Sequence, residues 1–208
     1  MAECFTCGYS NPGRPLRDVS EFVVDDDAAL VQQCLSGDEF SMRALVERFQ
    51  GMVFGLCFRM LGHREDAEDV AQDVFHRVFR SLHRWDSSRP LQPWLLTIAA
   101  NRCRTALQMR SRRPRETEFI ELVEDVGIET AGDFAEELQA ALEKVREQYR
   151  LCFVLFYQQE LSCSEIGNIL GCPQGTVKTW LHRARRDLAE HLKRRGFGPE
   201  AHHELHGI

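Results

Sequence analysis

The chain has 208 residues, of which 43% are hydrophobic and 28% charged, and a formal net charge of -6. These proportions are typical of a soluble globular protein with one medium domain or two small ones, and they exclude a chain that is disordered throughout. The N-terminus lacks the basic and apolar stretches of a secretion signal, and no apolar run approaches the roughly 20 residues that span a bilayer. We therefore expect a cytoplasmic protein without membrane contact.

Four of the eight cysteines, Cys34, Cys57, Cys103 and Cys152, lie among apolar residues at helical spacing. A reduced thiol in such a position packs as a small hydrophobic side chain. We therefore expect these cysteines to be core residues rather than a disulfide framework.

Charge is unevenly distributed along the chain. Residues 87–115 contain arginines and no acidic side chain, residues 178–195 are again mainly cationic, and residues 116–147 between them are acidic. The placement of charge says more about partners than the net sum does. The pattern predicts two DNA-facing modules joined by an acidic connector. One hypothesis is that this connector mimics nucleic acid and discourages the free protein from binding DNA.

The first half of the chain predicts a loose extension followed by helices. Residues 1–25 contain glycines and prolines without a sustained period, so we expect no core there. Helices are predicted from Ala28 to Leu35, through the apolar positions 45–60, and over 67–82, whose apolar residues form one stripe. After a polar loop a further helix is predicted from Pro93 to Arg110, with proline in its first turn.

The second half opens with a predicted linker over residues 111–132, which contain Pro114 and two glycines and show no clear period. Helices resume near Asp133. A second, almost wholly apolar helix is predicted around residues 151–157, and two more follow in close order.

Those last two helices form a helix-turn-helix pattern. Ser162 and Glu165 have the spacing of a capping box, and the helix that they begin ends at Gly171, a residue suited to a left-handed C-terminus. Pro173 starts a longer helix with one apolar and one cationic face. Gly167 departs from the alanine usual at its position, and glycine costs about 1 kcal/mol in a helix interior. The alternative is an ordinary helical hairpin with a solvated basic face.

The predicted fold class is all-α, with two small helical domains joined by a flexible linker and a helix-turn-helix in the second domain. The ranges that we assign to these parts are 1–25 for the extension, 26–110 for the first domain, 111–132 for the linker, 133–195 for the second domain and 196–208 for the C-terminal tail.

Three motifs in this order resemble the extracytoplasmic-function (ECF) sigma factors of the sigma-70 family. Residues 172–185, CPQGTVKTWLHRAR, resemble the promoter-reading helix of that family. Residues 59–62, RMLG, followed by 65–75, EDAEDVAQDVF, resemble its polymerase-binding segment, and residues 89–101 resemble its reader of the upstream strand. The resemblance covers about residues 27–193, and three motifs in family order are much more specific than a helix-turn-helix alone.

The resemblance implies a transcription initiation factor rather than an enzyme. Its first domain would bind core RNA polymerase and the minus-ten element and assist DNA melting, its linker would thread through the polymerase, and its second domain would read the minus-35 element. Core RNA polymerase and promoter DNA are the implied partners, and an anti-sigma factor is a third candidate. We expect no cofactor and no metal ion.

The resemblance also assigns roles to particular residues. The resemblance assigns polymerase binding to the polar face of the third helix, at Asp66, Asp69, Gln72 and Asp73. The alternative is that this face is simply exposed to solvent. Minus-ten binding falls on Asp86, Ser87, Ser88, Arg89, Trp94, Asn101, Arg102 and Arg104, the first four lining a pocket for a flipped base. Minus-35 binding falls on Lys178, Thr179, His182, Arg183 and Arg186, the last more suited to phosphate.

Some positions depart from the family pattern or leave other assignments open. Thr105 stands where an aspartate is common, and Val145-Arg146-Glu147 stands where Leu-Pro-Glu is common. Trp85 and Trp94 could be core residues, and His182 could be an uninvolved surface residue. These departures leave the predicted fold unchanged.

Three other functional classes compete with this interpretation. Cys4 and Cys7 near one end and His202, His203 and His206 near the other could bind zinc in a thiol or metal sensor. A simple helix-turn-helix regulator would share the second domain but would not need the acidic helix or the minus-ten segment. An enzyme is disfavoured, because neither a glycine-rich phosphate loop nor a nucleophile beside a base occurs in a recognisable motif.

Overall fold

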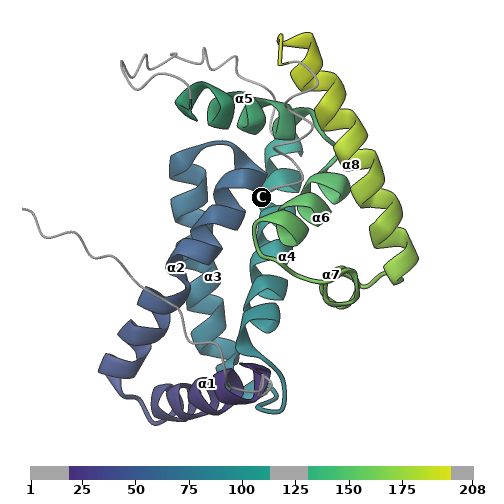
Figure 1. The fold of residues 1–208 in the computed structure, drawn as a ribbon. Helices are drawn as coiled ribbons and strands as arrows, with labels where there is room; N and C mark the ends of the chain where they lie inside the picture. The colour runs from purple at the N-terminus through teal and green to yellow at the C-terminus, as the bar shows by residue number, and fades with distance from the viewer. Residues whose placement is uncertain (1–18, 113–130, 198–208) are drawn as a thin grey trace, which may run out of the picture.

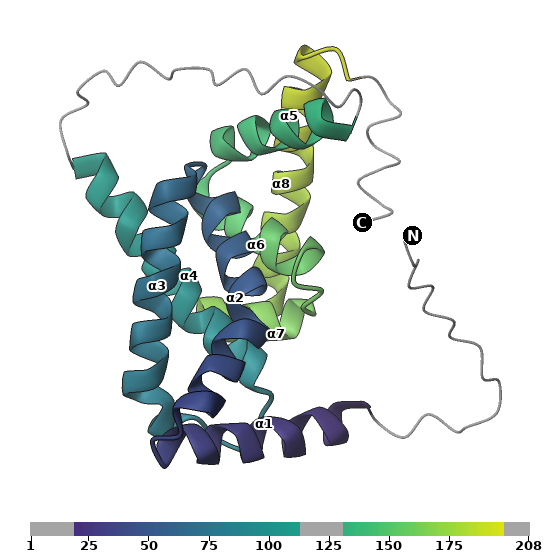
Figure 2. The same cartoon turned by 90° about the vertical axis from the view of Figure 1, so that its left-hand side faces the viewer.

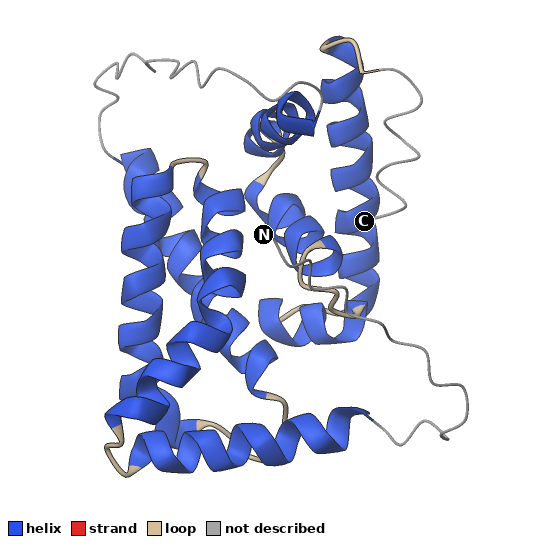
Figure 3. Ribbon diagram, turned by 60° about the vertical axis from the view of Figure 1, so that its left-hand side comes forward, coloured by secondary structure: helices blue, strands red, loops and turns tan. Residues whose placement is uncertain are grey.

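The computed structural model describes residues 19–112 and 131–197, and within these ranges its regular elements are all helices (Figures 1 and 3). The elements of the first range are α1 (Val19–Leu35), α2 (Glu39–Leu61), α3 (Arg64–Ser81), the 3-10 helix η1 (Leu82–Arg84) and α4 (Leu91–Arg112). Those of the second range are α5 (Ala131–Lys144), α6 (Glu147–Tyr157), α7 (Cys163–Leu170) and α8 (Gln174–Arg194). The predicted all-α class is confirmed.

Local signals in the sequence mark several helix ends correctly. The Asp38 side chain accepts a hydrogen bond from the Ser41 backbone N–H at 3.0 Å and begins α2, and Gly62, with φ of 80°, ends it. The predicted capping box of Ser162 and Glu165 is present at the start of α7. The first helix begins at Val19 rather than Ala28, so the last residues assigned to the N-terminal extension are helical.

The first range forms a bundle of α2, α3 and α4, with α1 lying across one end (Figures 1 and 2). The apolar stripe predicted on α3 faces α2 and α4, and its members Ala67, Val74 and Val78 are completely buried. The Asp27 carboxylate links α1 to the bundle, because it contacts the Arg48 guanidinium at 3.0 Å and accepts the Leu91 backbone N–H at 3.3 Å. Asp27 therefore fixes the start of α4.

The second range forms a smaller unit in which α6 and α7 pack against the long helix α8, and α5 lies across the far end of α8 (Figure 2). Val177, Leu181, Ala184, Leu188 and Leu192 form the buried face of α8. The predicted periodicity of this helix is confirmed, and its cationic face is left outward.

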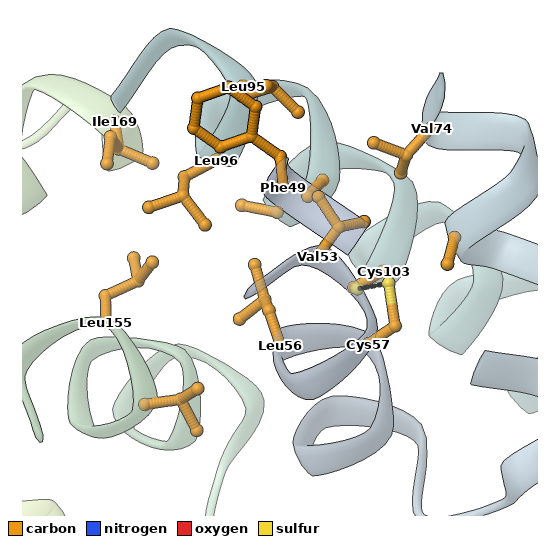
Figure 4. Close-up of a cluster of buried hydrophobic side chains, with 14 of the residues drawn as sticks. Phe49, Val53, Leu56, Cys57, Val74, Leu95, Leu96, Cys103, Leu155 and Ile169 are labelled. Atoms are coloured by element: carbon orange, nitrogen blue, oxygen red, sulfur yellow. Dashed lines mark hydrogen bonds between the residues drawn. The ribbon is translucent and has the colours of Figure 1, made fainter. Parts of the chain in front are cut away.

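The two units share one apolar core. Leu155 of α6 and Ile169 of α7 point toward Leu56 of α2 and Leu96 of α4 (Figure 4), and all four side chains are buried in one continuous cluster. The described parts of the two predicted domains are therefore docked on each other. Most of the predicted linker, residues 113–130, lies outside the described residues.

Polar contacts from the second unit converge on the last turn of α2. The buried Arg150 guanidinium donates to the Met60 carbonyl oxygen at 2.8 Å, and the Gln139 amide donates to the Phe58 carbonyl oxygen at 3.3 Å. Burial lowers the pKa of Arg150, although the charges of Glu143 and Glu147 act in the opposite direction. The Arg150 contact satisfies one of the carbonyl groups that a helix end leaves without an intrahelical partner, whereas the Phe58 carbonyl also accepts from the Gly62 backbone N–H at 2.9 Å.

The predicted core cysteines are buried, as expected from their apolar neighbours. The Cys57 and Cys103 sulfur atoms lie 3.7 Å apart between α2 and α4 (Figure 4). The hydrogen bond with Cys103 and burial raise the pKa of Cys57, and burial raises the pKa of Cys152 to about 12. The Cys57 and Cys152 thiols are therefore protonated at neutral pH and poor nucleophiles.

Two further sequence-based questions concern membrane contact and metal binding. Among the residues that the structure describes, no helix combines the length and apolar character needed to cross a bilayer. Within the same residues, His, Cys, Asp and Glu side chains form no cluster of three suited to a metal ion. The zinc ligands considered above, Cys4, Cys7, His202, His203 and His206, lie outside the described residues.

We expect Arg150→Ala to lower the free energy of unfolding by about 2 kcal/mol, because it removes a buried charge-assisted hydrogen bond to the Met60 carbonyl. Urea denaturation followed by circular dichroism measures the change. Arg194→Ala is the matched control, since Arg194 is exposed and pairs with Glu190 within the same helix. This pair should contribute less than about 0.5 kcal/mol. Equal losses in the two variants would contradict a stabilising role for the Arg150 contact.

Candidate nucleic-acid interface

The outward face of α8 carries the residues predicted to read the minus-35 element. Lys178, Thr179, His182, Arg183 and Arg186 are all exposed. Lys178, His182 and Arg186 follow one another at steps of four residues and form one line along the helix. A helix about 10–12 Å wide fits the major groove of B-DNA, so such a face can reach the edges of bases.

Three members of this face have partners within the protein. The Thr179 hydroxyl donates to the Gly175 carbonyl oxygen of the same helix at 3.0 Å. The Arg183 guanidinium donates to the Tyr149 hydroxyl on α6 at 2.8 Å, and Arg186 contacts Asp187 at 3.3 Å. Lys178 and His182 have no side-chain partner among the residues that the structure describes. The face therefore combines unengaged and pre-oriented donors.

The turn between α7 and α8 explains the glycine that departs from the usual alanine. The Cys172 backbone N–H donates to the Gly167 carbonyl oxygen at 3.0 Å, which brings the turn back over the helix. A β-carbon at position 167 would lie 2.7 Å from the Cys172 carbonyl oxygen, a backbone atom that cannot simply rotate away. Gly167 is thus a close-approach position, and the cost assigned to it from helix propensity alone was incomplete.

The loop before α4 holds the first four residues predicted for the minus-ten element. Asp86 accepts hydrogen bonds from the Ser88 backbone N–H at 3.0 Å and hydroxyl at 2.7 Å, and it contacts Arg89 at 3.5 Å. The hydrogen bonds from Ser88 lower the pKa of Asp86. Because Asp86, Ser87, Ser88 and Arg89 are all exposed, this ordered loop can contact a nucleotide.

The remaining minus-ten candidates are distributed around α4. Asn101 is exposed, seven residues and about 10 Å along the helix from Trp94, which is half-buried against the core. Arg102 and Arg104 diverge from this face and form ion pairs, with Asp73 of α3 and, at 3.8 Å, with Glu147 of α6. The structure brings Trp94 and Asn101 onto one side and directs the two arginines elsewhere.

The acidic helix α3 presents its predicted polymerase-binding residues outward. Asp66, Asp69 and Gln72 are exposed, and Asp73 is half-exposed. Asp66 lies 3.8 Å from Arg110, an exposed pair, whereas Asp69 and Gln72 lack side-chain partners among the described residues. Helix α3 lies on the opposite side of the bundle from α8 (Figure 2), so the two surfaces are separate.

Asp73, predicted for polymerase binding, contacts a residue of the other predicted surface of the first unit. It accepts from Arg77 at 3.2 Å and pairs with Arg102, a minus-ten candidate. Burial favours its neutral form, but the Arg77 hydrogen bond and the two guanidinium charges prevail, so the pKa of Asp73 lies below its usual value. A carboxylate predicted to bind polymerase is thereby joined to a guanidinium predicted to bind DNA.

Sequence reasoning missed several residues that organise these surfaces. Tyr149 holds Arg183, Asp27 fixes the start of α4, and Tyr157 lies beneath Arg185, whose guanidinium is 5.8 Å from the ring centroid. Each of these contacts joins residues far apart in the chain. The cationic and apolar periods that predicted α8 contain no signal for them.

Comparison with known proteins identifies the family. The chain matches the model for sigma-70 region 2 over residues 45–113 and the model for sigma-70 region 4 over residues 135–188. It is 31% identical to the ECF RNA polymerase sigma factor SigW of Bacillus subtilis, over 78% of this chain and 95% of that protein. The chain belongs to the ECF sigma factors of the sigma-70 family. Members of this family direct RNA polymerase to initiate transcription at specific promoters, and this sigma factor is a transcription factor with that role.

Further relatives agree in sequence and fold. The ECF RNA polymerase sigma-E factor of Haemophilus influenzae is 31% identical over 80% of this chain and 95% of that protein. A solved structure of CnrH in complex with the cytosolic domain of CnrY has a TM-score of 0.62 and 26% identity, and the match covers 81% of this chain and 97% of that chain. The sigma factor RpoE of Bartonella quintana, solved in complex with the anti-sigma factor NepR, shares the fold at a TM-score of 0.60 and 21% identity, over 73% of this chain and 96% of that chain.

We expect Gly167→Ala to destabilise the protein by about 1 kcal/mol. Helix propensity alone predicts a gain of about 1 kcal/mol, but overpacking against the Cys172 carbonyl costs about 1–3 kcal/mol. Thermal unfolding of the variant and of Gly51→Ala, a helical glycine with open space around its α-carbon, measures the difference. A more stable Gly167→Ala protein would show that the turn relaxes freely.

Proposed function

We propose that this sigma factor uses α3 to bind core polymerase, the loop 86–89 with α4 to bind the minus-ten element, and the outward face of α8 to read the minus-35 element. The single observation that carries the proposal is the exposed line of Lys178, His182 and Arg186 on the second helix of a helix-turn-helix. The protein itself would catalyse no reaction and would act in the cytoplasm, where the polymerase supplies the chemistry.

Each surface fits the chemistry of its proposed partner. The unengaged carboxylate of Asp69 and the neighbouring Gln72 suit a basic patch on a protein. The ordered loop at Asp86 and the half-buried Trp94 offer hydrogen-bond groups and an aromatic face to an unpaired base. An anti-sigma protein is a further candidate partner, because a structural relative was solved in complex with one.

The docked arrangement is too short to read both elements at once. The names of the elements place them about 25 base pairs apart, which is about 85 Å along B-DNA. A compact body of the size of the described ranges, 19–112 and 131–197, has a radius of gyration of about 15 Å. Two domains, 26–110 and 133–195, therefore separate when the protein is assembled with polymerase and promoter. The chain between Arg112 and Ala131 has a contour length of up to about 65 Å and can allow this separation.

Run-off transcription tests the proposal directly. Purified core polymerase and a genomic fragment library, with this protein added, should give new start sites that share two upstream elements. Lys178→Ala and His182→Ala should lower transcription from those starts about 5- to 100-fold, as expected when one base contact is lost. Lys193→Ala, at the exposed end of the same helix, is the matched control. Starts that do not depend on the protein would contradict the proposed function.

Energy transfer between two dyes tests the separation of the domains. With donor and acceptor at His76 on α3 and Lys193 on α8, introduced as non-natural amino acids, the free protein should show high transfer. Addition of core polymerase and promoter DNA should lower the transfer sharply, because the two elements lie about 85 Å apart. Unchanged transfer during productive transcription would show that the docked arrangement is the active one.

A further inference from the structure

One residue of the predicted reading face is held by a side chain from another helix. The Arg183 guanidinium donates from Nη1 to the Tyr149 hydroxyl at 2.8 Å, and its Cζ lies 5.7 Å from the centroid of the Tyr149 ring. The hydrogen bond holds the end of the arginine, and the cation–π contact with the same ring adds to it. Arg183 is therefore oriented before any DNA is bound.

Tyr149 is itself a rigid support. It is 7% exposed, it belongs to the core that α5, α6 and α8 share, and its ring lies 6.5 Å from that of Trp180. Its position in the first turn of α6 is fixed by the hydrogen bond from its backbone N–H to the Arg146 carbonyl at 2.9 Å. The hydroxyl is thus a fixed point beside an exposed helix face.

The electrostatics around this hydroxyl favour the same arrangement. Arg146 also approaches the ring, with its Cζ 6.0 Å from the centroid. The hydrogen bond from Arg183 is the main reason that the pKa of Tyr149 lies below its ordinary value. Since a phenolic oxygen accepts from a guanidinium in a charge-assisted bond, the contact is among the stronger hydrogen bonds of the second unit.

A held arginine can still read a base. The guanidinium has five N–H donors in a planar fork, and the Tyr149 contact is made through one of its terminal nitrogens. The remaining edge can donate two parallel hydrogen bonds to guanine O6 and N7, the commonest specific contact in the major groove. Fixing the long side chain beforehand removes part of the entropy lost when it binds.

We propose that Tyr149 is a positioning residue for promoter recognition, which presets Arg183 for one base pair of the minus-35 element. The inference rests on the proposed function of α8 and adds a residue outside the helix-turn-helix to its reading surface. Arg186 contacts its own neighbour Asp187, and Lys178 has no such support among the described residues. Specificity at the Arg183 position should therefore depend on Tyr149, whereas specificity at the other positions should not.

Tyr149→Phe isolates the role of the hydroxyl, because it keeps the ring and its packing. Tyr157→Phe is the matched control: Tyr157 also lies on α6 with an arginine of α8, Arg185, over its ring. Both variants are made in the full chain and assembled with core polymerase. Circular dichroism and urea unfolding establish that each variant is folded.

The measurement is initiation rate on a set of promoters in which every base pair of the minus-35 element is replaced in turn. Tyr149→Phe should lower discrimination about 3- to 10-fold at one base pair only, the same one at which Arg183→Ala loses it. The double variant should lose no more than Arg183→Ala alone, and the salt dependence of the rate should be unchanged in Tyr149→Phe. Tyr157→Phe should match the original protein at every position.

The outcomes distinguish failure of the proposed role of Tyr149 from failure of the proposed function of α8. A uniform loss across all promoters, or unaltered discrimination in Tyr149→Phe, overturns the positioning role while the reading function of α8 stands. If the original protein initiates equally on every minus-35 variant, the proposed function of α8 itself is wrong, and the role of Tyr149 is lost with it. A merely structural tyrosine would change stability without selecting one base pair.

Discussion

The packing of α6 and α7 against α2 and α4 is the contact on which the rest of the arrangement depends. It buries Leu56, Leu96, Leu155 and Ile169 in a single core that belongs to neither half alone. Small domains bury a smaller fraction of their surface than large ones, so each half gains from the other. Any state with the halves apart exposes this apolar surface, and the free energy that this requires has to come from the partners that bind the separated domains.

The features predicted correctly from the sequence are those encoded by neighbouring residues. The stripe on α3, the capping box at Ser162 and the two faces of α8 all follow from periods and spacings within one helix. The start of α1 was placed too late, because residues 19–25 lack a sustained apolar period that would indicate a helix. Contacts between the halves had no such signal, since Arg150 and Gln139 bind backbone carbonyls some 80 to 90 residues away in the chain.

Features of the candidate surfaces also divide into those that follow from one helix and those that depend on packing between helices. Exposure of Lys178 and His182 follows from the helical period, whereas the partners of Arg102 and Arg183 depend on how separate helices pack. Gly167 departs from the alanine usual at its position, and helix propensity alone assigns it only a loss of stability. The turn that follows it shows the compensating reason, which is a carbonyl oxygen in the space of a missing β-carbon.

The contacts at the end of α2 also bear on how the two halves could be recombined with those of related proteins. Gln139 and Arg150 donate hydrogen bonds to main-chain oxygen atoms. The Glu143 side chain occupies the space in which a β-carbon at position 62 would lie. Main-chain atoms are the same whatever residues carry them, so these two hydrogen bonds depend on where the helix ends and not on the side chains of its last turn. Gly62 is the exception, because its φ of 80° is a left-handed conformation that favours glycine. A chimaera that joins this C-terminal half to a foreign N-terminal half therefore needs a helix of matching length ending in glycine, in addition to apolar residues that match the shared core.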